Sequence, residues 1–141
     1  DGISDAPLRL ARQRMRSAAA SLEFERAAAW RDRADRLAWL FGRLRSFQAS
    51  MDRLTFRYVV PTPEGHHLYL LRRGTVRAAL RAPRTAEEEA ALETLARRIY
   101  LEADARGRDV PLHDLEEFYV VASWFRRNPG ELARTTAPMP T

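Results

Sequence analysis

Apolar residues recur at helical spacing over the first fifty residues of the chain. From Leu8 to Ala20 they recur every three or four positions, and no Pro or Gly follows Pro7, which predicts a helix with proline in its first turn. Ser21 is the expected N-cap of a second helix. Glu23 and Glu25 would lie in the first turn of that helix, where negative charge favours the helix dipole. The pattern therefore predicts two helices joined by a very tight turn.

The second helix is expected to be long. Large apolar residues recur along it at steps of three and four, the spacing of a stripe on one helix face: Leu37, Leu40, Leu44, Phe47, Met51 and Leu54. No Pro interrupts the stretch, and Gly42 weakens a helix by about 1 kcal/mol relative to Ala without breaking it. We predict one helix from about Glu23 to about Asp52. Trp30, Trp39 and Phe41 lie off the stripe, so they either pack against the first helix or leave an apolar surface for a partner.

A period of two replaces the helical pattern after residue 53. It predicts strands over residues 54–60, 66–72 and 75–81, in an antiparallel meander with one face toward a core. Residues 61–65, Pro-Thr-Pro-Glu-Gly, form the first turn. Arg73-Gly74 forms the second, tight turn, because Gly74 tolerates a positive φ.

Helical spacing returns near the C-terminus. Thr85 and Glu88 form a T-x-x-E capping box at the start of a helix over residues 86–101. A polar loop over 102–111 precedes a largely buried helix over 112–127, which Asn-Pro-Gly ends. An edge strand is expected within 131–136.

The predicted fold class is therefore α+β. Residues 1–53 form an antiparallel helical hairpin with a long second helix. Residues 54–136 form a small domain in which a three- to four-stranded antiparallel sheet packs with two helices. Residues 137–141 form a tail.

The composition of the chain limits its size class, its location and the metal sites that it could hold. The 141 residues suffice for one ordinary domain, or for a hairpin plus a compact domain. No run of 18 apolar residues and no signal peptide is present, so no membrane partner is expected. The absence of Cys excludes disulfides and Cys-based zinc sites and fits a cytoplasmic location. Since the first Met is Met15, we expect this chain to be a piece of a longer protein.

Charge is distributed unevenly. All 24 basic residues are Arg. Residues 1–84 hold 17 Arg and 8 acidic residues, whereas residues 85–141 hold 7 Arg and 11 acidic residues. The first part is therefore expected to face a polyanion or an acidic partner. The alternative is a solvated, Arg-rich helix face.

A spaced signature covers the predicted hairpin. It comprises Leu8, Met15, Ala18-Ala19, Leu22-Glu23-Phe24-Glu25, Ala27-Ala28 and Arg31-Asp32. This signature resembles the UVR motif, the helical hairpin shared by the UvrB and UvrC proteins of bacterial nucleotide excision repair. The resemblance implies that the hairpin docks onto a second UVR hairpin. It implies that Leu22 and Phe24 lie at the contact, with Phe24 as its anchor and with Glu23, Glu25, Arg31 and Asp32 as polar partners. The alternative is that Phe24 packs inward and Arg31-Asp32 is a solvated pair.

The resemblance extends more loosely beyond the hairpin. Residues 69–77, Tyr-Leu-Leu-Arg-Arg-Gly-Thr-Val-Arg, and the segment 124–132 are similar to the ending of Cho-like UvrC homologues. This similarity implies a GIY-YIG nuclease domain upstream and a place in DNA repair and the SOS response. The favoured interpretation is a non-catalytic C-terminal region of a UvrC-like nuclease that binds a UvrB-like helicase. The alternatives are a regulatory adaptor of the ClpC or McsA type and a self-associating hairpin, a homodimer.

Catalytic chemistry is not expected in this chain, nor is a cofactor. A GIY-YIG site needs paired Tyr, an Arg and a metal-binding Glu, and an RNase H-like site needs acidic residues on strands to hold two metals; neither pattern occurs. His66 and His67 are the strongest candidates for a pair of metal ligands. Adjacent strand residues point to opposite faces of a sheet, however, so the two cannot both bind one ion without a distorted backbone. His113-Asp114 is a further acid–base candidate that better suits a helix start.

A cluster of arginines on the strands suggests contact with DNA. It comprises Arg57, Arg72, Arg73, Arg77 and Arg81. Tyr58 and Tyr69 would supply rings on which single-stranded bases stack. The alternative is that both tyrosines belong to the core and that the arginines pair with acidic residues.

Overall fold

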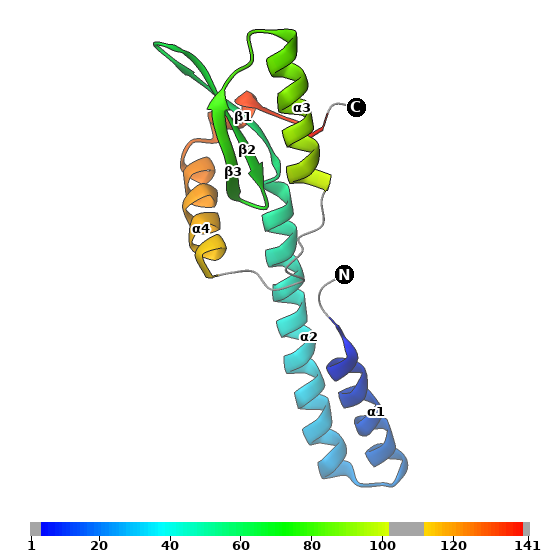
Figure 1. Ribbon diagram of the computed structural model, residues 1–141. Helices are drawn as coiled ribbons and strands as arrows, with labels where there is room; N and C mark the ends of the chain where they lie inside the picture. The colour runs from blue at the N-terminus through cyan, green and yellow to red at the C-terminus, as the bar shows by residue number, and fades with distance from the viewer. Residues whose placement is uncertain (1–3, 102–111, 140–141) are drawn as a thin grey trace. The chain divides into compact units, whose positions relative to one another are not determined.

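The computed structural model describes residues 4–101 and 112–139. The chain divides into two compact units, residues 1–49 and 50–141, and each is considered separately below. The predicted loop over 102–111 lies outside the described residues. No described helix is long and apolar enough to cross a membrane. The architecture is α+β, as predicted: a helical hairpin, then a four-stranded antiparallel sheet with two further helices (Figure 1).

The first unit is a hairpin of two helices. Helix α1 spans Ala6–Ala20 with proline in its first turn, and α2 spans Phe24–Arg53, its last residues belonging to the second unit. Their shared core is small and comprises Leu8, Ala11, Ala34 and Phe41, with Trp30, Leu37 and Ala38 packed against it. Both helices match their predicted extents within two residues.

The face of α2 that packs agrees with the predicted stripe only in part. Leu37 packs against the hairpin core and Met51 is buried, as the stripe predicts. Leu40 and Leu44 are exposed, whereas Phe41 is buried against α1. Helix α1 has only 15 residues, so it covers a limited length and one side of α2. Of the two tryptophans with open alternatives, Trp30 packs against the core and Trp39 is 67% exposed.

The prediction that Ser21 is the N-cap of the second helix is wrong. Ser21 is the C-cap of α1, and its backbone N–H donates to the carbonyl of Ser17. Helix α2 begins three residues later, at Phe24. A side chain at position 21 is therefore too far from the first turn of α2 to cap it.

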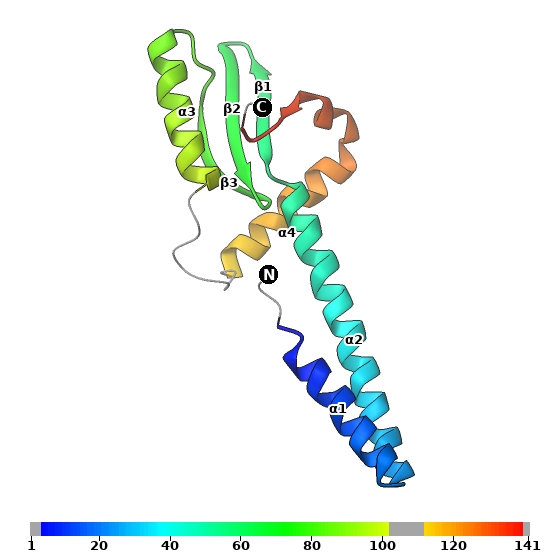
Figure 2. The same ribbon diagram turned by 90° about the vertical axis from the view of Figure 1, so that its right-hand side faces the viewer.

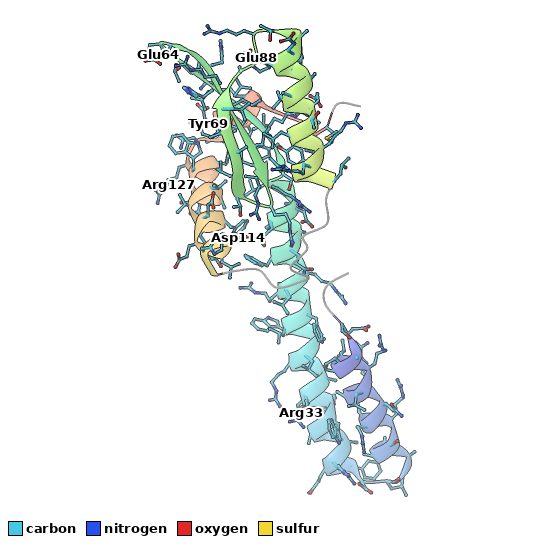
Figure 3. The ribbon with its side chains drawn as sticks, viewed as in Figure 1. Arg33, Glu64, Tyr69, Glu88, Asp114 and Arg127 are labelled. Carbon is cyan, nitrogen blue, oxygen red and sulfur yellow. The ribbon has the colours of Figure 1, made fainter. Side chains whose placement is uncertain are left out.

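The second unit contains a sheet with strand order β3-β2-β1-β4. Strands β1 (Phe56–Thr62), β2 (Gly65–Arg72) and β3 (Thr75–Arg81) form the predicted antiparallel meander. The first turn is tighter than the predicted residues 61–65, because pairing continues to Thr62 and Gly65. Glu64 therefore lies in the turn itself (Figure 3).

Helices cover both faces of this sheet, although one core face was predicted. Helix α3 (Ala86–Leu101) places Leu92 and Ala96 against Leu68 and Leu70 of β2. Helix α4 (Leu112–Arg127) places Phe125 on the opposite face. There its ring contacts those of Phe56 and Tyr58 at centroid distances of 5.1 and 5.2 Å. The unit is thus a helix–sheet–helix sandwich (Figure 2).

Local signals account for the helix boundaries. The backbone N–H of Glu88 donates to Thr85 Oγ1 at 3.2 Å, and the N–H of Thr85 donates to Glu88 Oε2 at 3.3 Å. This is the predicted capping box, and it fixes the start of α3 (Figure 3). Helix α4 also keeps its predicted bounds.

Helix α4 and the segment after it depart from prediction in two ways. Tyr119, Val120 and Trp124 are 63%, 69% and 50% exposed, so α4 is buried along one face only. The predicted edge strand shortens to β4 (Thr135–Thr136), because a 3₁₀ helix, η1 (Pro129–Arg134), occupies the preceding residues.

Acidic side chains of α4 reach the outer edge of β3. Glu117 Oε1 accepts a hydrogen bond from the backbone N–H of Val76 at 2.7 Å. Asp114 Oδ2 accepts one from Arg77 at 3.0 Å. The β2–β3 ladder also shifts register between Leu70 and Leu71. One end of this edge strand is therefore occupied by side chains of its own chain.

The β2–β3 turn is fixed by two left-handed residues and a close contact. Arg73 and Gly74 have φ of 54° and 78°, as a type I′ turn requires. A Cβ added at Gly74 would lie 2.5 Å from Phe118 Cδ2. Glycine is required there both for its backbone conformation and for its lack of a side chain.

Candidate partner-binding site

The tip of the hairpin is a tight turn with an unusual residue at its centre. The N–H of Glu23 donates to the carbonyl of Ala18 at 2.9 Å, and that of Leu22 donates to Ala19 at 3.1 Å. This pair of bonds is the Schellman ending of a helix, which normally has glycine at the left-handed position. Here that residue is Leu22, with φ of 59°. A left-handed leucine costs about 1–2 kcal/mol.

Two large apolar side chains point into solvent at this tip. Leu22 is 72% exposed and Phe24 is 69% exposed. The core cluster of the hairpin includes neither residue. Neighbouring exposed apolar groups are typical of an interaction surface. The inward-packing alternative for Phe24 is therefore not the arrangement in this structure.

Charged side chains lie next to the two apolar residues in the turn, and Arg31 and Asp32 follow about two turns further along α2. Glu23 accepts a hydrogen bond from Arg26 at 2.9 Å, and both side chains are largely open to solvent. Arg31 lies 3.6 Å from Asp32, and Glu25 stands exposed in the first turn of α2. Exposed ion pairs of this kind contribute little to stability, typically about 0–1 kcal/mol. These charges therefore remain available to a partner at little cost to the hairpin.

A shallow hollow of about 170 Å³ lies beside the tip. Side chains of both helices line it, among them Arg14, Ser17, Arg26 and Trp30. The guanidinium carbon of Arg33 lies 5.2 Å from the centroid of the Trp30 ring, a cation–π arrangement on α2 (Figure 3). Sequence reasoning missed this hollow, because nothing in the spacing of Arg14 and Trp30 indicates that they line the same hollow.

A family model agrees with the hairpin geometry. The UvrB/UvrC motif, UVR, matches residues 5–38. Residues 5–38 are a UVR motif. The match covers α1, the tip and the first half of α2, and it indicates a protein-interaction module of the UvrB/UvrC type. Comparison with curated proteins and with solved structures found no match to this chain.

Outside the UVR motif, the arginines predicted to contact DNA have partners within the second unit. Arg57 donates to both carboxylate oxygens of Glu93, at 2.6 and 3.0 Å, and to the carbonyl of Pro138. The hydrogen bond to Glu93 raises the pKa of the Arg57 guanidinium, and the same bond lowers the pKa of the Glu93 carboxyl. Only 12% of the Arg57 side chain is exposed, so its charge is largely taken up by the fold.

The other four arginines also have partners in the second unit but are less enclosed, and the side chain of Arg81 remains 68% exposed. Three form ion pairs at 3.0–3.3 Å, and Arg72 donates to the carbonyl of Ile99 at 2.9 Å. The ion pairs are Arg73–Asp52, Arg77–Asp114 and Arg81–Glu64. A role of these arginines in DNA contact stays a prediction, and any phosphate would compete with these partners.

The two candidate stacking residues differ in access. Tyr58 is buried, and its hydroxyl donates to Glu131 at 2.8 Å. Burial, together with this hydrogen bond, raises the pKa of Tyr58. Tyr69 is half-buried on the same face of the sheet (Figure 3). Tyr58 is therefore part of the core and offers no open ring face to a base.

A second tyrosine supports the sheet from the opposite side. The Tyr100 hydroxyl donates to the carbonyl of Phe56 at 3.0 Å, and burial raises the pKa of Tyr100 to about 12. The histidines are less constrained: His66 is exposed and His67 is half-buried. Within residues 4–101 and 112–139, no three His, Asp or Glu side chains gather as metal ligands.

Proposed function

We propose that this chain docks a nucleotide excision repair nuclease of the UvrC type onto a UvrB-like helicase. In this proposal the UVR hairpin binds the UVR hairpin of the helicase, and the chain is the non-catalytic C-terminal region of the nuclease. The observation that carries the proposal is the exposure of Leu22 and Phe24 together at the tip.

The energetics favour these two residues as anchors. Complete burial of a leucine or phenylalanine side chain yields about 1.5–3 kcal/mol. The left-handed backbone of Leu22 and the two hydrogen bonds behind it fix the backbone of the tip, and so the direction in which the side chain projects, before a partner arrives. Such preorganisation reduces the entropy lost on binding. The surrounding charges would then fix the orientation of the partner hairpin.

Calorimetric titration of the chain with the C-terminal UVR hairpin of a cognate UvrB tests this proposal. Phe24→Ala should weaken binding by at least about 30-fold, which corresponds to about 2 kcal/mol for an interface anchor. Leu10→Ala is the matched control, because Leu10 is 50% exposed on α1 and lies away from the tip. That variant should bind as the unmodified chain does. A folded chain that does not bind, or an equal loss in both variants, would contradict the proposal.

Three further outcomes define the alternatives. Sedimentation that shows a dimer sensitive to Phe24→Ala would favour a self-associating hairpin. Binding to an unfoldase of the ClpC type or to a protein-arginine kinase, but not to UvrB, would favour a regulatory adaptor. Metal-dependent cleavage of DNA by this chain alone would contradict the non-catalytic role.

A further inference from the structure

We propose that α1 carries a second binding surface, one for the phosphate backbone of nucleic acid. Its cationic residues are Arg9, Arg12 and Arg16, with Gln13 beside them. Positions three and four apart share a helix face, so these three arginines form one row. All four side chains are exposed, and together they line a hollow of about 420 Å³.

The charge on this face is scarcely neutralised. Helix α1 contains four arginines and no acidic residue. Arg9 pairs with Asp5, one turn before it. Among the described residues, no carboxylate forms an ion pair with Arg12 or Arg16. This is the opposite of the strand arginines, each of which has a partner in the fold.

The spacing of the row suits a phosphate backbone. Residues 9 and 16 are separated by about 10.5 Å along the helix axis, at 1.5 Å per residue. One strand of duplex DNA presents a phosphate about every 3.4 Å along its axis. Three arginines therefore span roughly the length of three phosphates.

The face offers little to a protein partner that binds through apolar contacts. Trp, Tyr and Arg are the residues enriched at the centres of protein interfaces, and no aromatic residue lies in α1. The row of Arg9, Arg12 and Arg16 has Asp5, Gln13 and small residues beside it, whereas Leu10 lies on another side of α1. The hairpin thus separates its surfaces by chemistry, with apolar and acidic groups at the tip and cations along α1. The inference does not depend on what the tip binds.

Fluorescence anisotropy with a labelled 20-base-pair duplex tests the proposal. Affinity is measured for the full chain and for the variant Arg9→Gln/Arg12→Gln/Arg16→Gln between 50 and 200 mM salt. Each lost phosphate contact removes about 0.9 from the log–log salt slope, so the variant's slope should be shallower by about 2.7. Over this range the unmodified chain should lose roughly 40-fold more affinity than the variant.

A charge-matched control separates this surface from net charge. Arg98→Gln/Arg126→Gln/Arg127→Gln also removes three exposed arginines, but from α3 and α4. Its salt slope should stay within about 1 of that of the unmodified chain. Equal losses in the two triple variants would overturn the proposal, as would the absence of salt-dependent DNA binding.

Two more variants test whether DNA binding depends on the positive charge of the row. Replacement of the same three arginines of α1 by lysine retains the charge, so it should retain the salt slope. Asp5→Asn removes the carboxylate that competes for Arg9 and should tighten binding. Weaker binding by Asp5→Asn, or loss of binding by the lysine variant with the helix intact by circular dichroism, would count against a phosphate-binding row.

Discussion

The two units of this chain differ in where they place phenylalanine side chains and in how they pair arginines. The hairpin leaves Phe24 at its tip exposed and three arginines of α1, Arg12, Arg14 and Arg16, without a carboxylate partner in the described structure. The helix–sheet–helix unit buries Phe125 between two aromatic rings and gives each strand arginine a partner. The hairpin has a small core, so apolar and cationic side chains remain exposed on its surface, where other molecules can contact them. The second unit uses Phe125 and its strand arginines for contacts within the fold, although α4 also exposes Tyr119, Val120 and Trp124.

The sharpest test of this comparison replaces one phenylalanine in each unit. Phe125→Ala should cost about 3–5 kcal/mol of unfolding free energy, because it leaves a cavity between the sheet and α4. Phe24→Ala should change stability by no more than about 0.5 kcal/mol, since its side chain is already in solvent. Urea denaturation followed by circular dichroism measures both. Equal losses of unfolding free energy in the two variants would contradict the difference between the buried Phe125 and the exposed Phe24.

A smaller effect is expected at the β2–β3 turn. Gly74→Ala should cost about 2–3 kcal/mol, because it combines a left-handed alanine with a clash against Phe118. Gly42→Ala is the matched control: Gly42 lies within α2, and no atom is near enough to obstruct an added Cβ. The control should stabilise its helix by up to about 1 kcal/mol. If both substitutions proved neutral in urea denaturation, the close contact would not constrain the turn.

Alkaline pH should weaken the second unit through Tyr100. Its pKa is raised to about 12 in the folded state, against about 10 when unfolded. Its contribution to stability is therefore fully present below pH 10 and falls as the pH rises through 12. Tyr100→Phe should flatten this dependence and cost about 1 kcal/mol at neutral pH through its lost hydrogen bond. The checks are tyrosinate absorbance and urea denaturation; an unchanged alkaline profile in the variant would exclude Tyr100 as the cause.

The smallest expected effect has the opposite sign. Leu22→Gly relieves the left-handed leucine but adds backbone freedom to the unfolded chain, so the hairpin should gain about 0.5–1 kcal/mol. Binding to the partner hairpin should weaken at the same time, because an apolar contact is lost. Thermal unfolding and calorimetry measure the two quantities. A variant that lost stability would show that Leu22 supports the hairpin itself.

Local signals explain why much of the fold was predictable. The capping box of Thr85 and Glu88 and the Arg73-Gly74 turn each act within four residues, so the sequence alone identifies them. The packed face of α2 is different. Its apolar residues offer two overlapping stripes, and the choice between Leu40 and Phe41 depends on where α1 lies.

The candidate site also combines features that the sequence predicts with features that only the structure shows. The spacing around Phe24 identifies the hairpin tip, but the exposure of Leu22 and Phe24 follows from the three-dimensional turn. Pairing of the strand arginines with acidic residues was one of two alternatives, but the sequence did not indicate the particular partners. Arg57 meets Glu93 across 36 residues and Arg77 meets Asp114 across 37, and one sequence gives no sign of such long-range partners.

The contact between Glu117 and the N–H of Val76 has a consequence for the behaviour of the protein in concentrated solution. An edge strand offers unpaired backbone groups to strands of other molecules, which is a common origin of aggregation. Here a carboxylate takes one of those donors, and Arg77 and the register shift beside it further disfavour an added strand. On the opposite side of the sheet, β4 pairs with β1 only at Arg57 and Tyr58, and in the part of β1 beyond that pairing Pro61 lacks the donor that an intruding strand would need. Strand-to-strand polymerisation is thereby discouraged along both margins of the sheet, so the second unit is expected to stay monomeric with respect to strand pairing even at high concentration.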